Sequence, residues 1–179
     1  SNIGKPLSYT SLSKVIGVKN PTTAKNYLEF AENTYLLFSV SKLDFSVKAQ
    51  LRNPKKIYAI DNGLISRLGF HFSGEEGRLL ENLVYIGLRR QAKEVFYHQS
   101  GNTECDFVVR DGFRVTEAIQ VCYTFDVYGT REREIRGLSE AMKTYHLDEG
   151  LIITAFHEEE IEQDGRRIRI LPAWKWLKG

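Results

Sequence analysis

The residues of this sequence that could do chemistry lie in two neighbouring strand-like segments. Asp106 lies in the first segment, and Gln120 and Cys122 lie in the second. The dipeptide Asp111-Gly112 between them is a strong signal for a hairpin turn, so we expect the two strands to pair. Residues i and i+2 of a strand share a face, so Gln120 and Cys122 would point together toward Asp106. A carboxylate that faces a polar pair in this way is a layout that holds a divalent metal ion beside a phosphodiester.

The composition is typical of a globular protein. The chain has 179 residues, of which 42% are hydrophobic and 27% charged, which argues against disorder. No window approaches the roughly 20 apolar residues of a membrane helix, so no membrane partner is expected. The two cysteines, Cys105 and Cys122, lie inside predicted strands without zinc-site spacing, so we expect buried thiols in a reducing cytoplasm. Because the single methionine is Met142, we expect a fragment of a longer protein.

The charge is distributed unevenly along the chain. Residues 1–70 carry ten Lys and Arg against four Asp and Glu, a net charge of +6. The remaining 15 basic and 19 acidic residues give residues 71–179 a net charge of −4. A basic half of this size is a candidate for a polyanionic partner such as DNA.

The spacing in residues 1–70 predicts a helix-turn-helix. A short helix over residues 11–17 ends at Gly17, and a second helix begins with Asn20 as its cap and Pro21 in its first turn. The second helix is expected to bury four residues spaced i, i+3, i+4 and i+7: Ala24, Tyr27, Leu28 and Ala31.

Two predicted strands complete this first domain. They span residues 36–45 and 56–60, and the basic loop over 46–55 contains no acid. A helix-turn-helix followed by such a hairpin is the winged-helix plan, with the loop as the wing. Phosphate contacts would come from the front of the second helix and from the wing region: Thr22, Thr23, Lys25, Asn26, Lys48, Arg52, Lys55 and Lys56. The alternative is a structural or protein-docking unit whose lysines are only solvated.

Residues 71–179 are expected to form a second, α/β domain. A long helix over residues 75–93 precedes three strands, over 95–98, 105–109 and 115–123. A polar helix, an apolar strand, a further strand and a short terminal helix follow, over residues 129–145, 151–155, 168–171 and 172–177. The acidic run at 158–160 is expected to be a solvated loop. This order predicts an α/β sandwich with a mixed sheet.

Three of these features together resemble a known fold. Glu81 in the long helix, Asp106 in the segment 104–108 and the run 119–122 are similar in order to the PD-(D/E)xK, or restriction-endonuclease-like, fold. The whole chain also resembles the C-terminal region of AAA+ ATPases that end in a DUF4143 module, through residues 54–64, 80–85 and 104–108. The resemblance implies a winged helix, a nuclease-like domain and an N-terminal P-loop ATPase domain of the same full-length protein. The chain itself has no GxxxxGK[ST] motif.

The resemblance also implies roles for four residues. Glu81 and Asp106 would ligate Mg²⁺ in an active enzyme, and Gln120 would add a further ligand. Cys122 stands where the family has the lysine that supports the reaction. Because glutamine is uncharged and a thiol cannot replace an ammonium, the site is expected to be degenerate, with no cofactor. Loss of such a cation commonly costs about 10²–10³ in rate.

The sequence therefore favours a non-catalytic module that binds DNA or a protein partner. Arg131, Arg133 or Arg136 on the following helix could supply the missing charge. An active Mg²⁺-dependent DNA endonuclease that uses Glu81, Asp106 and Gln120 is the first alternative. A protein-docking module without nucleic acid is the second.

Overall fold

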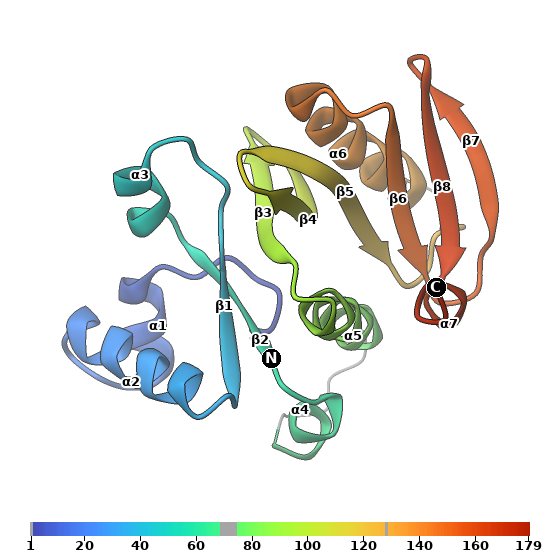
Figure 1. Ribbon diagram of the computed structural model, residues 1–179. Helices are drawn as coiled ribbons and strands as arrows, with labels where there is room; N and C mark the ends of the chain where they lie inside the picture. Colours follow the sequence, from blue (N-terminus) through green and yellow to red (C-terminus); the bar gives the residue numbers. More distant parts are fainter. Residues whose placement is uncertain (1, 69–74, 128) are drawn as a thin grey trace.

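The protein has a mixed α/β fold built around two sheets. The computed structural model describes residues 2–68, 75–127 and 129–179. A two-stranded antiparallel sheet lies beside a six-stranded sheet of mixed direction (Figure 1). The α/β fold with a mixed sheet is therefore confirmed. The expected boundary at residues 70 and 71 lies outside the described residues.

The described part of the first half, residues 2–68, contains four helices and the small sheet. In chain order these elements are α1 (Tyr9–Val15), α2 (Pro21–Asn33), β1 (Leu37–Ser41), α3 (Val47–Arg52), β2 (Lys55–Ala59) and α4 (Asn62–Leu68). The predicted start of α2 is confirmed, because the Asn20 side chain accepts a hydrogen bond from the Thr22 amide at 2.8 Å and Pro21 occupies the first turn. Ala24 and Leu28 are buried as expected.

Details of the first half differ from the predictions. Tyr27 and Ala31 were expected in the core, but the Tyr27 side chain is 54% exposed and Ala31 is only half-buried, because the buried face of α2 is centred on Ala24 and Leu28. The expected basic loop contains the helix α3, which begins after Ser46 because the serine hydroxyl accepts a hydrogen bond from the Ala49 amide. Lys55 belongs to β2 and not to the loop.

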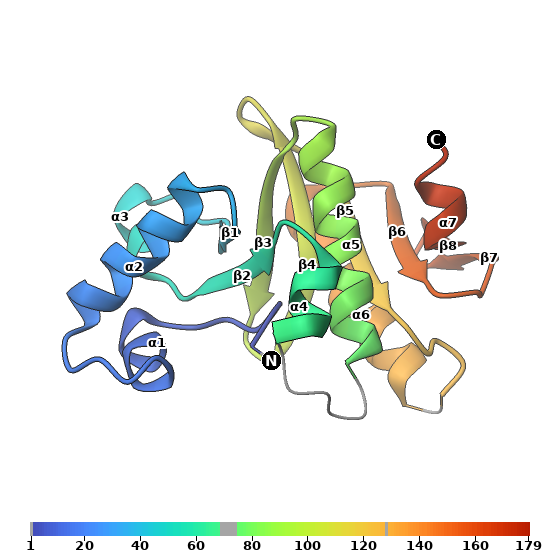
Figure 2. The ribbon, with the colours of Figure 1, turned by 90° about the horizontal axis from the view of Figure 1, so that it is seen from below.

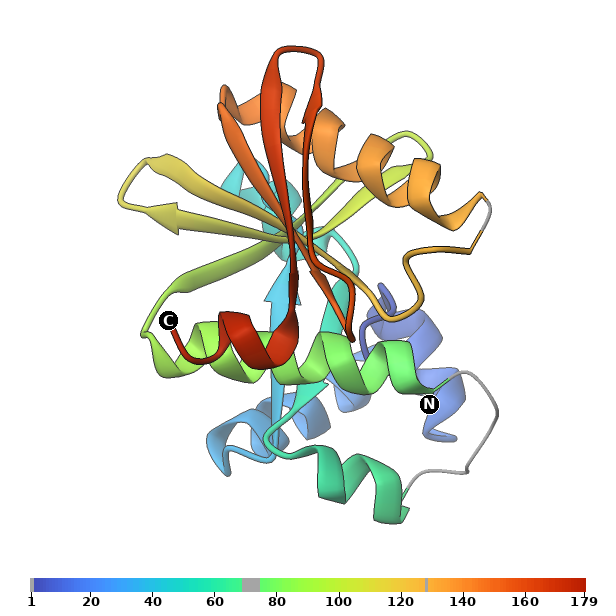
Figure 3. The same cartoon turned by 90° about the vertical axis from the view of Figure 1, so that its right-hand side faces the viewer.

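Over residues 75–127 and 129–179 the second half contains the six-stranded sheet and three helices. In chain order these elements are α5 (Glu76–Arg90), β3 (Glu94–Ser100), β4 (Thr103–Asp111), β5 (Arg114–Cys122), α6 (Thr130–Tyr145), β6 (Glu149–Thr154), β7 (Glu159–Gln163), β8 (Arg166–Pro172) and α7 (Ala173–Trp176). The strand order is β3-β4-β5-β6-β8-β7. The β4 and β5 strands form the predicted antiparallel hairpin, whereas β5, β6 and β8 run parallel. Figure 3 shows α6 on one side of this sheet and α5 with α7 on the other.

The acidic run at 158–160 is not a loop, which corrects that expectation. Glu159 and Glu160 begin β7, which pairs antiparallel with β8. An ion pair between Arg167 and Glu160 links the two strands at 2.9 Å. Asp164 and Gly165 turn the chain with positive φ angles of 53° and 70°, as a tight hairpin requires. All three glutamates of the run are therefore paired: Glu160 with Arg167 on β8, Glu159 with Arg131 on α6 and Glu158 with Lys175 on α7.

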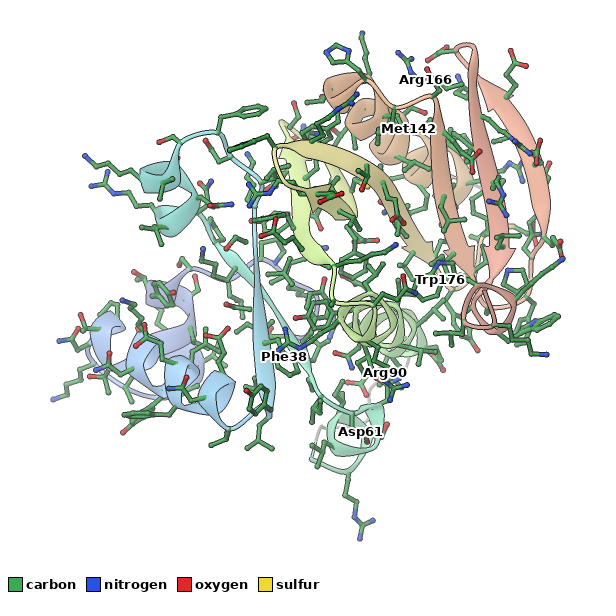
Figure 4. The ribbon with its side chains drawn as sticks, in the orientation of Figure 1. Phe38, Asp61, Arg90, Met142, Arg166 and Trp176 are labelled. Carbon is green, nitrogen blue, oxygen red and sulfur yellow. The ribbon has the colours of Figure 1, made fainter. Side chains whose placement is uncertain are left out.

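A hydrophobic core joins the two halves. Phe38 on β1 and Tyr58 on β2 belong to the same buried cluster as Tyr85 on α5 and Phe107 on β4. The rings of Tyr58 and Tyr85 stack with their centroids 4.5 Å apart. Figure 4 shows Phe38 on the side of β1 that faces α5. The small sheet is therefore packed on the central helix and does not form a separate core.

A second buried cluster lies between α6 and the large sheet. Leu138 and Met142 on α6 pack against strand residues that include Val108 and Ile152. Both cysteines, Cys105 and Cys122, are buried in this cluster as free thiols, as predicted. Within the described ranges, no helix is both long enough and apolar enough to span a bilayer.

Candidate functional site

The candidate site is organised around the ammonium group of Lys56. The Nζ atom lies 2.8 Å from Asp106 Oδ1, 3.1 Å from Glu81 Oε1 and 2.7 Å from Glu104 Oε1. An ammonium group has three N–H donors, so each carboxylate receives one of them. The contacts to Glu104 and Asp106 have the length of charge-assisted hydrogen bonds, and the contact to Glu81 is longer. The Lys56 side chain is only 1% exposed, so a positive charge is held inside the protein by three acids.

Lys56 lies on β2, and Figure 2 shows this strand running from the first half toward α5 and β3. All five residues of β2 are buried. Lys56 and Tyr58 are two residues apart and therefore share a strand face. The Tyr58 hydroxyl donates to Glu81 Oε1 at 2.7 Å, the same oxygen that Lys56 contacts. The strand is fastened further by Asn82 on α5, whose side-chain amide pairs with the backbone of Ala59 at 2.8 and 3.0 Å.

The N-terminal segment packs against the Glu81 carboxylate of this cluster. The Gly4 amide donates to the carbonyl of Ile57 at 3.1 Å, so this segment runs along β2. A Cβ atom on Gly4 would lie 2.5 Å from Glu81 Oε2, and Gly4 has a positive φ of 73°. Only glycine satisfies both conditions without strain.

Burial and the neighbouring charges together set the pKa values of the cluster. Burial alone would lower the pKa of Lys56, but Asp106, Tyr58, Glu81 and Glu104 together hold that pKa well above its ordinary value. Burial, followed by the negative charge of Asp106, raises the pKa of Glu81 to about 7 although Lys56 and Tyr58 oppose the shift. Three carboxylates share one ammonium, so a proton on Glu81 relieves their mutual repulsion.

The other predicted site residues lie beside this cluster. Asp106 Oδ2 accepts a hydrogen bond from the Val121 amide at 3.0 Å. Gln120 Oε1 accepts from the Asp106 amide at 3.1 Å, and its Nε2 donates to Glu134 on α6 at 2.5 Å, an amide orientation set by these partners. The structure therefore brings Glu81, Asp106 and Gln120 together, with Gln120 bonded to the backbone of Asp106.

Lys56 places a cation beside Glu81 and Asp106, whereas two arginines of α6 are paired with other acids. Arg131 pairs with Glu159 at 2.7 Å, and Arg133 pairs with Glu134 at 2.6 Å. Cys122 stands beside them as a buried thiol, and burial raises its pKa to about 12. The thiol is therefore neutral near neutral pH and cannot serve as a cation or as a strong ligand.

One side of the site faces an open groove. Its lining includes Glu81, Asp106, Gln120, Cys122 and Arg133. Across the described ranges, no group of three or more His, Cys, Asp or Glu side chains is arranged to hold a metal ion. The oxygens around Lys56 lie 2.7–3.1 Å from a common centre, whereas Mg²⁺ requires about 2.0–2.1 Å and Ca²⁺ about 2.3–2.6 Å. The space between these carboxylate oxygens therefore has the size of an ammonium group, and it is too wide for direct coordination of Mg²⁺ or Ca²⁺.

Sequence reasoning missed Lys56, Tyr58 and Glu104 as members of this site. The contact between Lys56 and Asp106 spans 50 residues, so no local periodicity reveals it. The sequence did contain one signal. Lys56 and Tyr58 lie on the same face of a short apolar strand, and a solvent-exposed Lys56 would leave a gap in the side chains that this face presents to the core. A lysine inside a strand buried on both faces needs an acidic partner.

The candidate DNA-binding residues separate into two groups. Thr22, Lys25, Asn26, Lys48 and Arg52 are exposed, and Thr23 is half-buried. Lys55 and Lys56 lie inside the protein, which corrects the expectation that they face phosphates. Lys55 Nζ donates to Ser41 Oγ at 2.8 Å and to the Gln50 carbonyl at 2.7 Å, and burial lowers its pKa.

Comparisons with known proteins identify relatives along nearly the whole chain. A family model described as a domain of unknown function (DUF8612) matches residues 1–75, and it is a different model from the DUF4143 module named above. Uncharacterized protein MJ1544 of Methanocaldococcus jannaschii is 35% identical over 161 residues, which cover 84% of this chain and 35% of that protein. An uncharacterized protein of Haemophilus influenzae is 27% identical over 175 residues, which cover 96% of this chain and 40% of that protein. The chain thus spans little more than a third of these relatives.

One solved structure gives a weak match. It is a chain from the refined half-complex of Thermococcus gammatolerans McrB AAA+ hexamers with bound McrC. The match has a TM-score of 0.41 at 11% identity and covers 90% of this chain and 44% of that chain. A similarity of this size defines neither a shared fold nor a function.

Replacement of Lys56 by methionine is expected to lower the free energy of unfolding by about 3–5 kcal/mol, because it leaves three clustered carboxylates without their cation. Urea denaturation at neutral pH measures this change. Lys48→Met is the matched control, since Lys48 is exposed, and we expect a change within about 0.5 kcal/mol. Equal effects of the two substitutions would contradict the role assigned to Lys56.

Replacement of Glu81 by glutamine is expected to change how stability depends on pH. Since the folded pKa of Glu81 is raised from about 4.5 to about 7, the folded state binds the proton more tightly between these values. The contribution of Glu81 is therefore fully present below pH 4.5 and is lost as the pH rises through 7. Between pH 5 and 8 the wild type should lose roughly 2 kcal/mol relative to Glu81→Gln. Parallel pH profiles from urea titrations would refute this assignment.

Proposed function

We propose that this chain is a non-catalytic interaction module of a longer AAA+ ATPase. In this proposal a winged-helix-like first half is joined to a nuclease-like α/β domain that has lost its chemistry. The observation that carries the proposal is the Lys56 ammonium, which is held by the carboxylates that an active enzyme would use to bind a metal ion.

The hydrogen-bonding capacity of the site supports this loss of catalysis. All three N–H donors of Lys56 are used by Glu81, Glu104 and Asp106. Gln120 brings no charge, and its amide is committed to the Asp106 backbone and to Glu134. A divalent ion would have to displace a paired lysine from a buried site, which would leave an uncompensated charge.

The connection to an ATPase is supported by two observations. The segments 54–64, 80–85 and 104–108 resemble the C-terminal region of AAA+ proteins. The chain spans 35% and 40% of two curated relatives, so those proteins have ample length for a further domain. In this proposal the partner of the module is the P-loop domain of the same full-length protein, in the cytoplasm.

DNA contact is a second candidate function, favoured by charge on the first half. Lys48 and Arg52 on α3 are exposed and form no ion pair within the described part of the chain. The front of α2 presents Thr22 and Asn26 to solvent, whereas Lys25 is paired with Glu29 at 3.3 Å. Such contacts would be directed at phosphates and would be weakened by salt.

The purified chain is expected to leave labelled duplex and branched DNA intact in Mg²⁺ or Mn²⁺, because Lys56 occupies the carboxylates. Background nicking should be equal in the wild type and in Asp106→Ala. Isothermal titration calorimetry should detect no binding of Mn²⁺. Cleavage that disappears in Asp106→Ala would establish the runner-up function, a metal-dependent endonuclease that uses Glu81, Asp106 and Gln120 with Lys56 as its cation.

The DNA candidate predicts salt-sensitive binding of duplex DNA. Lys48→Glu with Arg52→Glu should weaken the affinity and reduce the dependence on salt concentration, since two phosphate contacts are lost. Lys175→Glu, in the second half, is the control and should have no effect. Electrophoretic mobility shifts at low and moderate salt measure both quantities. Absence of any salt-sensitive binding would eliminate DNA and leave protein docking as the role of the module.

A further inference from the structure

A second groove lies between residues 43–50 and the turn that joins β4 to β5. The C-terminal end of α6 forms its third side, and its volume is about 900 Å³. Four partly buried apolar side chains line it and pack on the second core cluster: Leu43, Val115, Tyr145 and Leu147. Because the core of the large sheet supports these side chains, the groove has a fixed apolar floor.

Phe113 projects at the edge of this groove, at the tip of the β4–β5 hairpin. Asp111 pairs with Arg114 across the hairpin. The turn between them consists of Gly112, which has a positive φ of 57°, and Phe113. Turn positions usually carry Gly, Asn, Asp or Ser. The Phe113 side chain is 102% exposed, so the fold gains no burial from an aromatic ring in this position.

Other exposed apolar side chains extend this face of the molecule. Phe45 is 94% exposed and Val47 is 70% exposed, and both line the groove. An aromatic side chain buries roughly 150–250 Å². Phe45 and Phe113 therefore offer roughly 300–500 Å² per copy of the chain, to which Val47 and the floor add. Specific interfaces begin at about 1,200 Å² in total, or about 600 Å² per partner. Two copies that bury this face against each other reach the lower end of that range.

The charges that line the groove are balanced. Of its Asp, Glu, Lys and Arg side chains, two are basic and two are acidic: Arg110, Arg114, Asp44 and Asp111. Arg110 is paired with Glu94 at 3.0 Å, and Asp44 accepts a hydrogen bond from a backbone amide at 2.9 Å. Arg114 and Asp111 are exposed, and neither forms an ion pair with another described residue. The face therefore presents one free cation and one free acid, side by side at the end of the hairpin.

Neither a nucleic acid nor an added strand suits this face. A balanced lining has no net charge to attract phosphates. The β3 strand is an edge of the large sheet, but the Leu43 amide donates to the Tyr97 carbonyl on it at 2.9 Å. The chain's own residues therefore cover the edge beside the groove, which blocks the addition of a strand. The face requires a partner with exposed apolar side chains and charges of both signs.

A second copy of the chain meets this requirement. A two-fold axis sets a surface against itself, so that residue i contacts j while j contacts i. Phe113 lies at the edge of its own groove, so one axis inserts both rings into both grooves. The same axis can set Arg114 of each copy against Asp111 of the other. Because ring and groove share one face, the contact closes at two copies and does not extend into a fibre.

We propose that this face joins two copies of the chain in a two-fold symmetric dimer. The Phe113 ring of each copy enters the apolar groove of the other, beside Phe45 and Val47. Arg114 of each copy pairs with Asp111 of the other. The inference goes beyond the proposed function as an interaction module, because it assigns one face of the module to a second copy of the same chain.

The first test measures self-association by analytical ultracentrifugation of the full chain. We expect a monomer–dimer equilibrium with a Kd in the micromolar range, because the interface is small. Phe113→Ser removes two rings from each dimer, so at about tenfold per ring the Kd should rise about a hundredfold. The circular dichroism spectrum should not change, since the side chain is exposed. Phe156→Ser is the matched control: Phe156 is 82% exposed and lies outside the groove, and its removal should have no effect.

The second test uses the symmetry of the contact. Arg114→Glu alone sets acid against acid at both charge contacts, and Asp111→Lys alone sets cation against cation, so each variant should dimerise at least about tenfold more weakly. An equimolar mixture of the two variants restores an opposite-charge pair at both contacts of a heterodimer. Native mass spectrometry should therefore find the heterodimer at about the wild-type level and both homodimers depleted.

Four outcomes would overturn the proposal. They are a chain that remains monomeric throughout the micromolar range, equal losses in Phe156→Ser and Phe113→Ser, a mixture that forms no more heterodimer than homodimer, and dissociation of the dimer by a duplex oligonucleotide. The last would assign the face to nucleic acid. Asp106→Ala should dimerise like the wild type, so discovery of nuclease activity would overturn the proposed function without affecting the dimer.

Discussion

The structure depends on one buried ammonium group. Lys56 lies on a strand of the first half, and its three acidic partners lie on α5 and β4 of the second half. Desolvation of each ion costs several kcal/mol, so the cluster is favourable only when all of its members are in place. The Tyr58–Tyr85 stack and the amide pairing of Asn82 lie next to it and depend on the same placement of β2. The two halves are therefore expected to unfold as one cooperative unit.

Local signals in the sequence predicted much of the fold, because they act over a few residues. Asn20 and Pro21 marked the start of α2, and Asp111-Gly112 marked the β4–β5 hairpin. The predicted convergence of Glu81, Asp106 and Gln120 came from resemblance, and the structure brings the three together. Tyr27 was misjudged because helical spacing alone does not show how wide the buried face of α2 is. The strand β7 was missed because its glutamates are paired with arginines that lie in other elements, Glu160 with Arg167 on β8 and Glu159 with Arg131 on α6.

The charge count of the first half is a poor guide to its surface. Two of its ten basic residues, Lys55 and Lys56, are buried, and one of these is committed to acids of the other half. A third, Lys25, is paired with Glu29 on the same helix. The net charge of +6 therefore overstates the positive potential that a polyanion would meet. Whether a basic segment is available for binding depends on how many of its lysines and arginines are buried or paired with acids within the protein.

The spacing of the Lys56 contacts along the chain also bears on synthesis. Lys56 is separated by 25 residues from Glu81 and by 50 from Asp106. A ribosome releases β2 well before the strand that neutralises its lysine, so the nascent first half has an incomplete core until β4 emerges. Long-range contacts of this kind form late and leave apolar surface accessible in the meantime. Until β4 has been synthesised, Lys56 is solvated, and it makes β2 more polar than a strand of apolar residues would be. Its charge also opposes pairing of β2 with another nascent chain.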